Sequence, residues 1–365
     1  MNNIIEYKEI LAFHPGYYIA DIIEDMEISQ AEFAIRLGTT PKTVSKLING
    51  QCNLSNDLAQ KLSIMLGTGI EIWLNLQKTY DQKLAEIEQQ RCFDSQAEIV
   101  DLIDYSYFTR IAKLPNTRDK LEKTANLCSF FKVSDLRILR EPDFLVNYRT
   151  GISSVEEKNI VNAQAWLQTA INFANMSQVQ KFNVEKLKRY LPEIRSMTIQ
   201  KPEFFLPRLK NIFSECGVIF VLLPHLKNSG INGAVKWFTP DRVMLAMNDR
   251  RCYADTFWFS LFHEIGHVLQ QKHKTTFISS STQDMKQIDS KFEQEADEFS
   301  SNYLIPKCYY KKICFNPYIS DAEICCFAKE IGIHPGIVAG RLQHDKIIAP
   351  NRCAQLKVKY QILVQ

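Results

Sequence analysis

The chain lacks a strong charge of either sign. Its 365 residues carry 44 Lys and Arg against 41 Asp and Glu, which leaves a net charge of +3. A balance this small does not by itself indicate a protein that binds nucleic acid through a general positive field. Net charge therefore leaves the class of partner open.

Long apolar runs, a leader sequence and cysteine pairs are missing too. No apolar stretch approaches the roughly 18 residues that a membrane span needs, and Met1 to Glu9 lacks the pattern of a signal peptide. The ten cysteines include no CxxC pair and no regular spacing, which is typical of scattered reduced thiols. These absences predict a cytoplasmic protein that does not contact a membrane.

One short stretch has the spacing of a metal site. His263 and His267 are four residues apart, so on a helix both imidazoles lie on one face and can reach one ion. Glu264 borders that face, where its side chain can hold a water molecule beside the metal. This is the H-E-x-x-H arrangement of zinc peptidases. Zn²⁺ also needs a third protein ligand and an open fourth position, and Glu295, 28 residues past His267, is the candidate ligand.

H-E-x-x-H also occurs by chance, on ordinary core helices with surface histidines. Here the context favours the metal site. Phe259, Phe262, Ile265 and Leu269 are spaced for a buried helix face, Asp255 is a candidate N-cap, and a second acidic helix follows at 292–299.

Three further residues could support the site. His273 lies about 280° around the helix from His263 and cannot share its face, but on a loop it could steady an oxyanion. Asp297 and Glu293 could orient a liganding histidine. The alternative for all three is a solvated surface position.

Residues 29–50 have the pattern of two short helices joined by a turn. Ser29 and Glu32 form a capping box that predicts a helix from Gln30 to the stop at Gly38. Thr40 is the expected N-cap of the next helix, with Pro41 at its first position and Gly50 after its end. A helix-turn-helix of this kind can place its second helix in the major groove.

The polar residues of this motif suit phosphates and base edges. The candidate DNA contacts are Gln30, Lys42, Thr43, Ser45, Lys46 and Asn49. Residues 1–90 have 7 Lys and Arg against 12 Asp and Glu, net −5, which also suits a protein-binding domain. Within 28–63 the count is 4 against 2, net +2, so a locally basic face remains compatible with DNA.

Both ends of the chain resemble known families. His14-Pro15-Gly16 and the segments 29–38, 43–50 and 73–77 resemble HigA-type antitoxins of the XRE, lambda-repressor-like group, which implies a homodimer on double-stranded operator DNA. The stretches 262–267, 293–299 and 303–306 resemble ImmA/IrrE metallopeptidases, although Ser300 replaces the usual Ala. This resemblance implies that His263, His267 and Glu295 hold Zn²⁺ and that Glu264 is the general base.

The predicted fold is α+β and mostly helical. We expect a lambda-repressor-like helix-turn-helix domain at 1–90, a helical spacer at 91–200, a zincin-like metallopeptidase domain with a small sheet at 201–310, and a helix-turn-helix-like extension at 311–365. Strands are predicted at 218–223, 233–237 and 242–247. Gly230–Trp237 is the candidate edge strand for pairing with an extended substrate, a plain structural hairpin being the alternative. For the extension a structural role is favoured over DNA contact.

Three functions follow from this layout. The first is a DNA-binding regulator whose zinc endopeptidase domain cleaves a repressor-like protein or the chain itself. The second is a non-catalytic repressor or antitoxin that uses the metal domain as a sensor or scaffold. The third is a peptidase whose helix-turn-helix binds only a protein, such as a small toxin.

Overall fold

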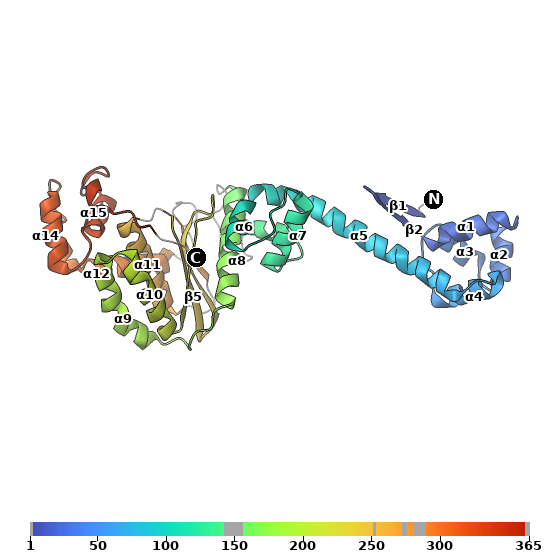
Figure 1. The fold of residues 1–365 in the computed structure, drawn as a ribbon, viewed down its shortest axis with the longest axis horizontal. Helices are drawn as coiled ribbons and strands as arrows, with labels where there is room; N and C mark the ends of the chain where they lie inside the picture. Colours follow the sequence, from blue (N-terminus) through green and yellow to red (C-terminus); the bar gives the residue numbers. More distant parts are fainter. Residues whose placement is uncertain (1–2, 142–155, 251–252, 272–275, 281–289, 362–365) are drawn as a thin grey trace. The chain divides into compact units, whose positions relative to one another are not determined.

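The computed structural model describes residues 3–141, 156–250, 253–271, 276–280 and 290–361. The chain divides into two compact units, Met1–Ala97 and Glu98–Gln365 (Figure 1). Each unit has its own hydrophobic core, so each is described by itself.

The first unit contains a β-hairpin followed by helices. The hairpin pairs β1 (Ile4–Tyr7) with β2 (Ile10–Phe13) in antiparallel register, and Ala12 packs with Tyr80 and Ile87. The helices of this unit are α1 (Pro15–Asp25), α2 (Gln30–Arg36), α3 (Pro41–Ile48), α4 (Asn56–Leu66) and the start of α5 (Ile70–Leu102).

The helix-turn-helix forms where its capping residues predict it. Ser29 Oγ accepts a hydrogen bond from the Glu32 amide, and Gly38 adopts a φ of 65° after α2. Thr40 Oγ1 accepts from the Thr43 amide at the start of α3. These groups satisfy backbone donors that a helix end leaves without partners, so the turn between α2 and α3 is set by local chemistry.

The segment 73–77, which is part of the resemblance to HigA-type antitoxins, packs in the core of the first unit. Trp73 is buried and its Nε1 donates to Thr68 Oγ1 at 2.8 Å. Gln77 Oε1 accepts from the Leu54 amide at 2.8 Å, which ties α5 to the loop before α4. His14 caps α1, because its Nδ1 accepts from the Gly16 amide at 2.9 Å.

The second unit is built around a four-stranded sheet with the order β3-β5-β4-β6. β3 is parallel to β5, whereas β4 is antiparallel to both β5 and β6. The strands are β3 (Val218–Leu223), β4 (Ile231–Thr239), β5 (Arg242–Asn248) and β6 (Thr276–Ser280).

Helices cover both faces of this sheet, and alternate residues of β5 show why. Val243, Leu245 and Met247 enter one core, while Met244 and Ala246 enter the other. One face packs against α6 (Tyr105–Ile111), α7 (Lys120–Phe131) and α8 (Glu157–Asn175) (Figure 1). The opposite face packs against α9 (Val184–Ser196), α10 (Pro202–Cys216) and α11 (Ala254–Gln270).

The segment expected as a spacer therefore contributes to the core of the second unit. Trp166 on α8 is fully buried, as expected, and its Nε1 donates to the carbonyl of Pro224 after β3. Tyr107 on α6 donates to the same carbonyl. The boundary between the units lies inside α5, between Ala97 and Glu98.

The expectation that Gly230–Trp237 is an edge strand is wrong. β4 lies between β5 and β6 and pairs with both, so its backbone groups are already used. The outer strand on this side is β6, a segment for which no strand was predicted from the sequence.

The C-terminal helix pair is α14 (Asp321–Ile331) and α15 (Pro335–His344). Gly332 ends α14 with a φ of 68°, and His334 caps α15 as His14 caps α1. α15 packs against α11, and its residues from Gly336 to Ala339 are all buried. This packing is compatible with the structural role favoured from the sequence, which stays a prediction.

None of the helices described here combines the length and apolar composition needed to cross a membrane.

Candidate metal centre and DNA-reading helix

Helix α11 carries both histidines, and most of its residues are buried. Phe262, His267 and Leu261 are fully inaccessible, and His263 is 7% exposed. The predicted N-cap Asp255 is instead in the first turn after the N-cap Tyr253, and it forms an ion pair with Lys357 at 2.7 Å. Lys357, from the C-terminal segment, therefore supplies a charge partner for the Asp255 carboxylate.

Helix α12 (Ser290–Leu304) supplies the third potential ligand, after the two histidines of α11. It approaches α11 closely at Gly266, where a Cβ atom would lie 3.2 Å from the Ala296 Cα and 3.3 Å from its Cβ. A glycine inside a helix is destabilising by roughly 1 kcal/mol relative to alanine. The close approach of α11 and α12 explains why a glycine stands at position 266. This approach brings a carboxylate from α12 next to the histidines.

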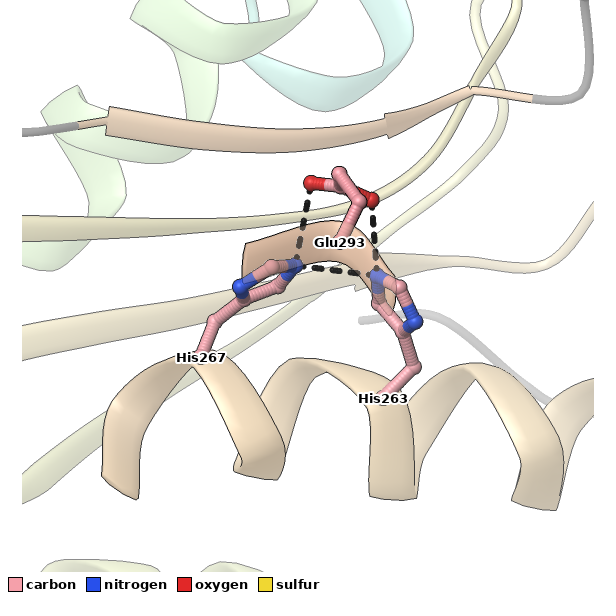
Figure 2. Close-up of side chains that lie close together, drawn as sticks. All are labelled: His263, His267 and Glu293. Carbon is pink, nitrogen blue, oxygen red and sulfur yellow. Dashed lines mark hydrogen bonds and ion pairs between the residues drawn. The ribbon is translucent and has the colours of Figure 1, made fainter. Parts of the chain in front are cut away.

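That carboxylate belongs to Glu293 (Figure 2). Its Oε2 lies 3.3 Å from His263 Nε2 and its Oε1 lies 3.2 Å from His267 Nε2. The two Nε2 atoms are 2.9 Å apart. Three potential ligand atoms from two helices therefore converge on one point.

The structure corrects the choice of Glu295 as the third ligand. Glu295 is exposed and does not belong to the cluster of ligand atoms. Two residues along a helix amount to about 200°, so Glu293 and Glu295 lie on opposite sides of α12. Ala296 and Ser300 are fully buried against α11, and both share the face of Glu293. That periodicity in the sequence could have identified Glu293.

The ligand set fits a zinc ion. Zinc–nitrogen and zinc–oxygen distances of about 2.0–2.2 Å with tetrahedral angles require donor atoms roughly 3.3–3.5 Å apart. The observed separations of 2.9, 3.2 and 3.3 Å come within a few tenths of an ångström of that range. Two imidazoles and one carboxylate are also a ligand set that catalytic zinc sites use, with a fourth position left for water or substrate.

The charges of the cluster favour a cation. Burial disfavours the charged imidazolium of His263, but hydrogen bonds with Asp297 and Glu293 outweigh it and raise the pKa of His263 to about 10. Burial likewise opposes ionisation of Glu293, yet hydrogen bonds from the two histidines lower its pKa to about 2. The carboxylates therefore stabilise a positive charge at the histidines. A metal ion bound between these groups would take the place of the proton.

Glu264 lies close enough to this cluster to favour the charged form of His263 and so raise its pKa, but it is not one of the potential ligands. It is fully buried on α11 and faces strand β4 at Gly233. A Cβ atom at Gly233 would overlap the Glu264 carboxylate and lie 2.8 Å from its Cδ and Cγ. β4 also shifts register against β6 between Ile231 and Gly233, so this glycine marks the place where the strand accommodates the carboxylate.

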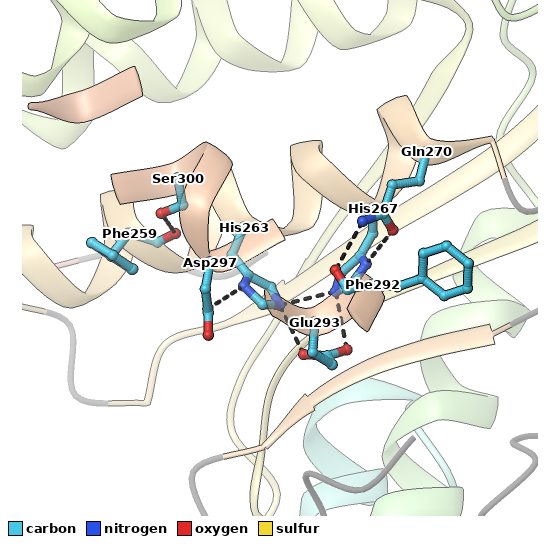
Figure 3. Close-up of polar contacts among 8 residues, drawn as sticks. All are labelled: Phe259, His263, His267, Gln270, Phe292, Glu293, Asp297 and Ser300. Atoms are coloured by element: carbon cyan, nitrogen blue, oxygen red, sulfur yellow. Dashed lines mark hydrogen bonds and ion pairs between the residues drawn. The ribbon is translucent and has the colours of Figure 1, made fainter. Parts of the chain in front are cut away.

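Asp297 contacts the first histidine from outside the cluster. Its Oδ1 lies 2.8 Å from His263 Nδ1 (Figure 3). A carboxylate accepts, so this nitrogen carries the hydrogen and Nε2 is the ligand atom. Asp297 is therefore positioned to orient His263. His273, another supporting residue expected from the sequence, lies outside the described residues.

The candidate DNA contacts gather on and before α3. Lys42 and Lys46 are exposed, as is Gln30 at the start of α2. The other three, Thr43, Ser45 and Asn49, are half-buried, and Asn49 Nδ2 donates to the Ser45 carbonyl at 2.7 Å. Val44, Leu47 and Ile48 face the core, so the polar side of α3 is turned outward as predicted.

Comparisons with known proteins agree with both ends of this description. The helix-turn-helix family HTH_3 matches residues 19–73, and the IrrE N-terminal-like domain of peptidase family M78 matches residues 227–343. The uncharacterized HTH-type transcriptional regulator YddM of Escherichia coli is 36% identical over 75 residues, which are 20% of this chain and 78% of that protein. The chain belongs to the XRE-type helix-turn-helix regulators. This regulator also carries an IrrE/ImmA-type peptidase domain of family M78.

Two further relatives match a similar length of the regulator. Virulence-associated protein I of Dichelobacter nodosus is 30% identical over 84 residues, covering 23% of this chain and 78% of that protein. A solved structure of an addiction module antidote protein of the HigA family from Coxiella burnetii is 29% identical, with a TM-score of 0.22, and covers 23% of this chain and 92% of its own.

Proposed function

We propose that this regulator binds operator DNA through its first unit and cleaves peptide bonds through a zinc ion in its second. The observation that carries the proposal is the convergence of His263, His267 and Glu293, with the buried carboxylate of Glu264 beside them. The cluster lies in the segment that matches the M78 peptidases.

The residues divide the chemistry between them. Zinc held by the cluster would polarise a peptide carbonyl and lower the pKa of a water molecule. Glu264 would accept a proton from a water molecule in the open fourth position and return it to the leaving amine. Burial of its carboxylate against Gly233 restricts the positions that the carboxylate can adopt. Asp297 holds His263 in the tautomer that presents Nε2.

The position of β6 at the outside of the sheet is the reason for proposing a polypeptide substrate. Among the described strands β6 pairs only with β4, and it contacts α11, which carries the histidines. An extended peptide that added to β6 would pass beside the site, held by main-chain hydrogen bonds that any sequence can make. The substrate we propose is a regulatory protein such as a repressor, or this chain itself.

The DNA-binding side of the proposal rests on α3. One helix of this size reads only a half-site, and regulators of this kind bind two half-sites as a dimer. We therefore propose a homodimer that acts on double-stranded operator DNA in the cytoplasm, with a small toxin as a further partner where the operon encodes one.

The full chain should bind the promoter region of its own operon as a dimer. Lys46→Ala should weaken binding to all sequences and lower the salt dependence by about one ion, because an exposed lysine contacts phosphate. Thr43→Ala should cost about 1–3 kcal/mol at one base pair and relax specificity there. Fluorescence anisotropy against salt concentration measures both effects. Lys78→Ala, an exposed lysine on α5, is the matched control. Equal affinity for the promoter region and random DNA would refute the operator-binding role.

The peptidase half is tested by metal-dependent cleavage. The zinc-loaded protein, and the same protein stripped with a chelator, are incubated with proteins encoded near its gene and with a second copy of the chain. Fragments identified by mass spectrometry should appear only with zinc and should return when zinc is restored. Zinc binding without cleavage of any of these proteins would favour the non-catalytic alternative, in which the metal domain is a sensor or scaffold.

A further inference from the structure

One residue beside the metal cluster belongs to no recognised sequence pattern. Gln270 ends α11, three residues after His267, and its side chain lies between α11 and α12 (Figure 3). Its Oε1 lies 3.0 Å from His267 Nδ1, and its Nε2 donates to the carbonyl of Phe292 at 2.8 Å. We propose that Gln270 is a positioning residue that fixes the metal-binding tautomer of His267. This inference rests on the proposed zinc site.

The tautomer follows from the direction of the two hydrogen bonds. The Phe292 carbonyl can only accept, so the amide nitrogen of Gln270 must face it. The amide oxygen then faces His267, and because an oxygen of this kind only accepts, Nδ1 of His267 carries the hydrogen. A neutral imidazole with hydrogen on Nδ1 has its lone pair on Nε2, which is the atom aimed at Glu293 and His263.

The same hydrogen-bond pair connects the two helices that supply ligands. Phe292 directly precedes Glu293, so Gln270 links a ligand on α11 to the residue before a ligand on α12. His267 is fully buried, so solvent cannot replace the amide oxygen if it is withdrawn. The two histidines are thus oriented by different chemistry, His263 by a carboxylate and His267 by an amide that is itself held in place.

Gln270→Asn should lower zinc affinity roughly 10–100-fold, the usual effect of losing the partner that orients a liganding histidine. Asparagine is shorter by one methylene and cannot reach His267 and Phe292 together. The measurement is competition for zinc between the full chain and a chromophoric chelator. The matched control is Gln271→Asn, because Gln271 is adjacent and exposed, and its φ of 52° is one that asparagine tolerates. It should bind zinc as the wild type does.

Gln270→Glu separates orientation of the histidine from simple bridging of the helices. A glutamate carboxylate still accepts from His267 Nδ1 but can no longer donate to the Phe292 carbonyl. If Gln270 acts through the histidine, Gln270→Glu should retain more zinc affinity than Gln270→Asn, to within about tenfold of the wild type.

Each outcome decides the matter. Equal zinc affinity of the wild type and Gln270→Asn would overturn the inference while leaving the zinc site intact. Loss of affinity in Gln270→Glu as large as in Gln270→Asn would show that the residue only bridges the helices, which also overturns it. A wild type that binds no zinc would refute the proposed site and the inference together.

Discussion

Glu264→Gln should leave zinc bound and reduce the rate of peptide cleavage by about 10²–10⁴-fold, the usual contribution of general acid–base catalysis. Glu264 is not among the converging ligand atoms, so removing its negative charge should not empty the site. Glutamine has nearly the same size and fits the same buried space against Gly233, but it cannot take a proton from water. The variant thus separates metal binding from turnover.

The measurement combines elemental analysis with co-expression. Wild type and Glu264→Gln are each produced with candidate repressors from the same locus, and full-length proteins and fragments are followed by mass spectrometry. The regulator itself is included as a candidate substrate. Glu298→Gln, on the exposed side of α12, is the control and should cleave normally. Fragments formed equally by wild type and Glu264→Gln would come from a contaminating protease and would remove the support for a peptidase.

Glu293→Gln should lower zinc occupancy sharply, whereas Glu295→Gln should keep close to one zinc per chain. Glu293 has both carboxylate oxygens within 3.3 Å of the histidine Nε2 atoms, while Glu295 is exposed on the opposite side of α12. The two variants make the same chemical change two residues apart, so each serves as the control for the other. His263→Ala should also lose the metal, because it removes one of two nitrogen ligands.

Elemental analysis of the purified variants after equal dialysis gives the answer. Full zinc in Glu293→Gln together with loss in Glu295→Gln would restore the ligand expected from the sequence and contradict the geometry. Full zinc in all three variants would rule out this cluster as the metal site.

The parts of this structure that depend on local chemistry were predictable. The helix-turn-helix follows from Ser29, Gly38, Thr40 and Pro41, each of which acts within three residues of its own position. Strand β3 was predicted to the residue, because a run of six apolar residues ends at Pro224. The fold class and both family resemblances are confirmed as well. They could be predicted because the motifs that carry them are short and contiguous.

The parts that depend on contacts between distant segments were not. Asp255 lies in the first turn of α11 and pairs with Lys357, about a hundred residues away, and no local pattern announces this partner. The edge of the sheet was misplaced because β6 arrives from beyond α11 and covers β4. Glu293 and Glu295 are equally acidic in the sequence, and what distinguishes them is that Glu293 shares a helix face with Ala296 and Ser300, which are buried against α11.

The burial of α15 also constrains the operator. Two helix pairs have the helix-turn-helix layout: α2–α3 in the first unit, whose α3 turns its polar side outward, and α14–α15 in the second unit, whose α15 packs against α11. A chain that reads DNA with α3 alone recognises one half of a sequence. A dimer of such chains imposes its twofold axis on the DNA, so the operator should be an inverted repeat whose half-sites are centred about 10 base pairs, or a multiple of that, apart.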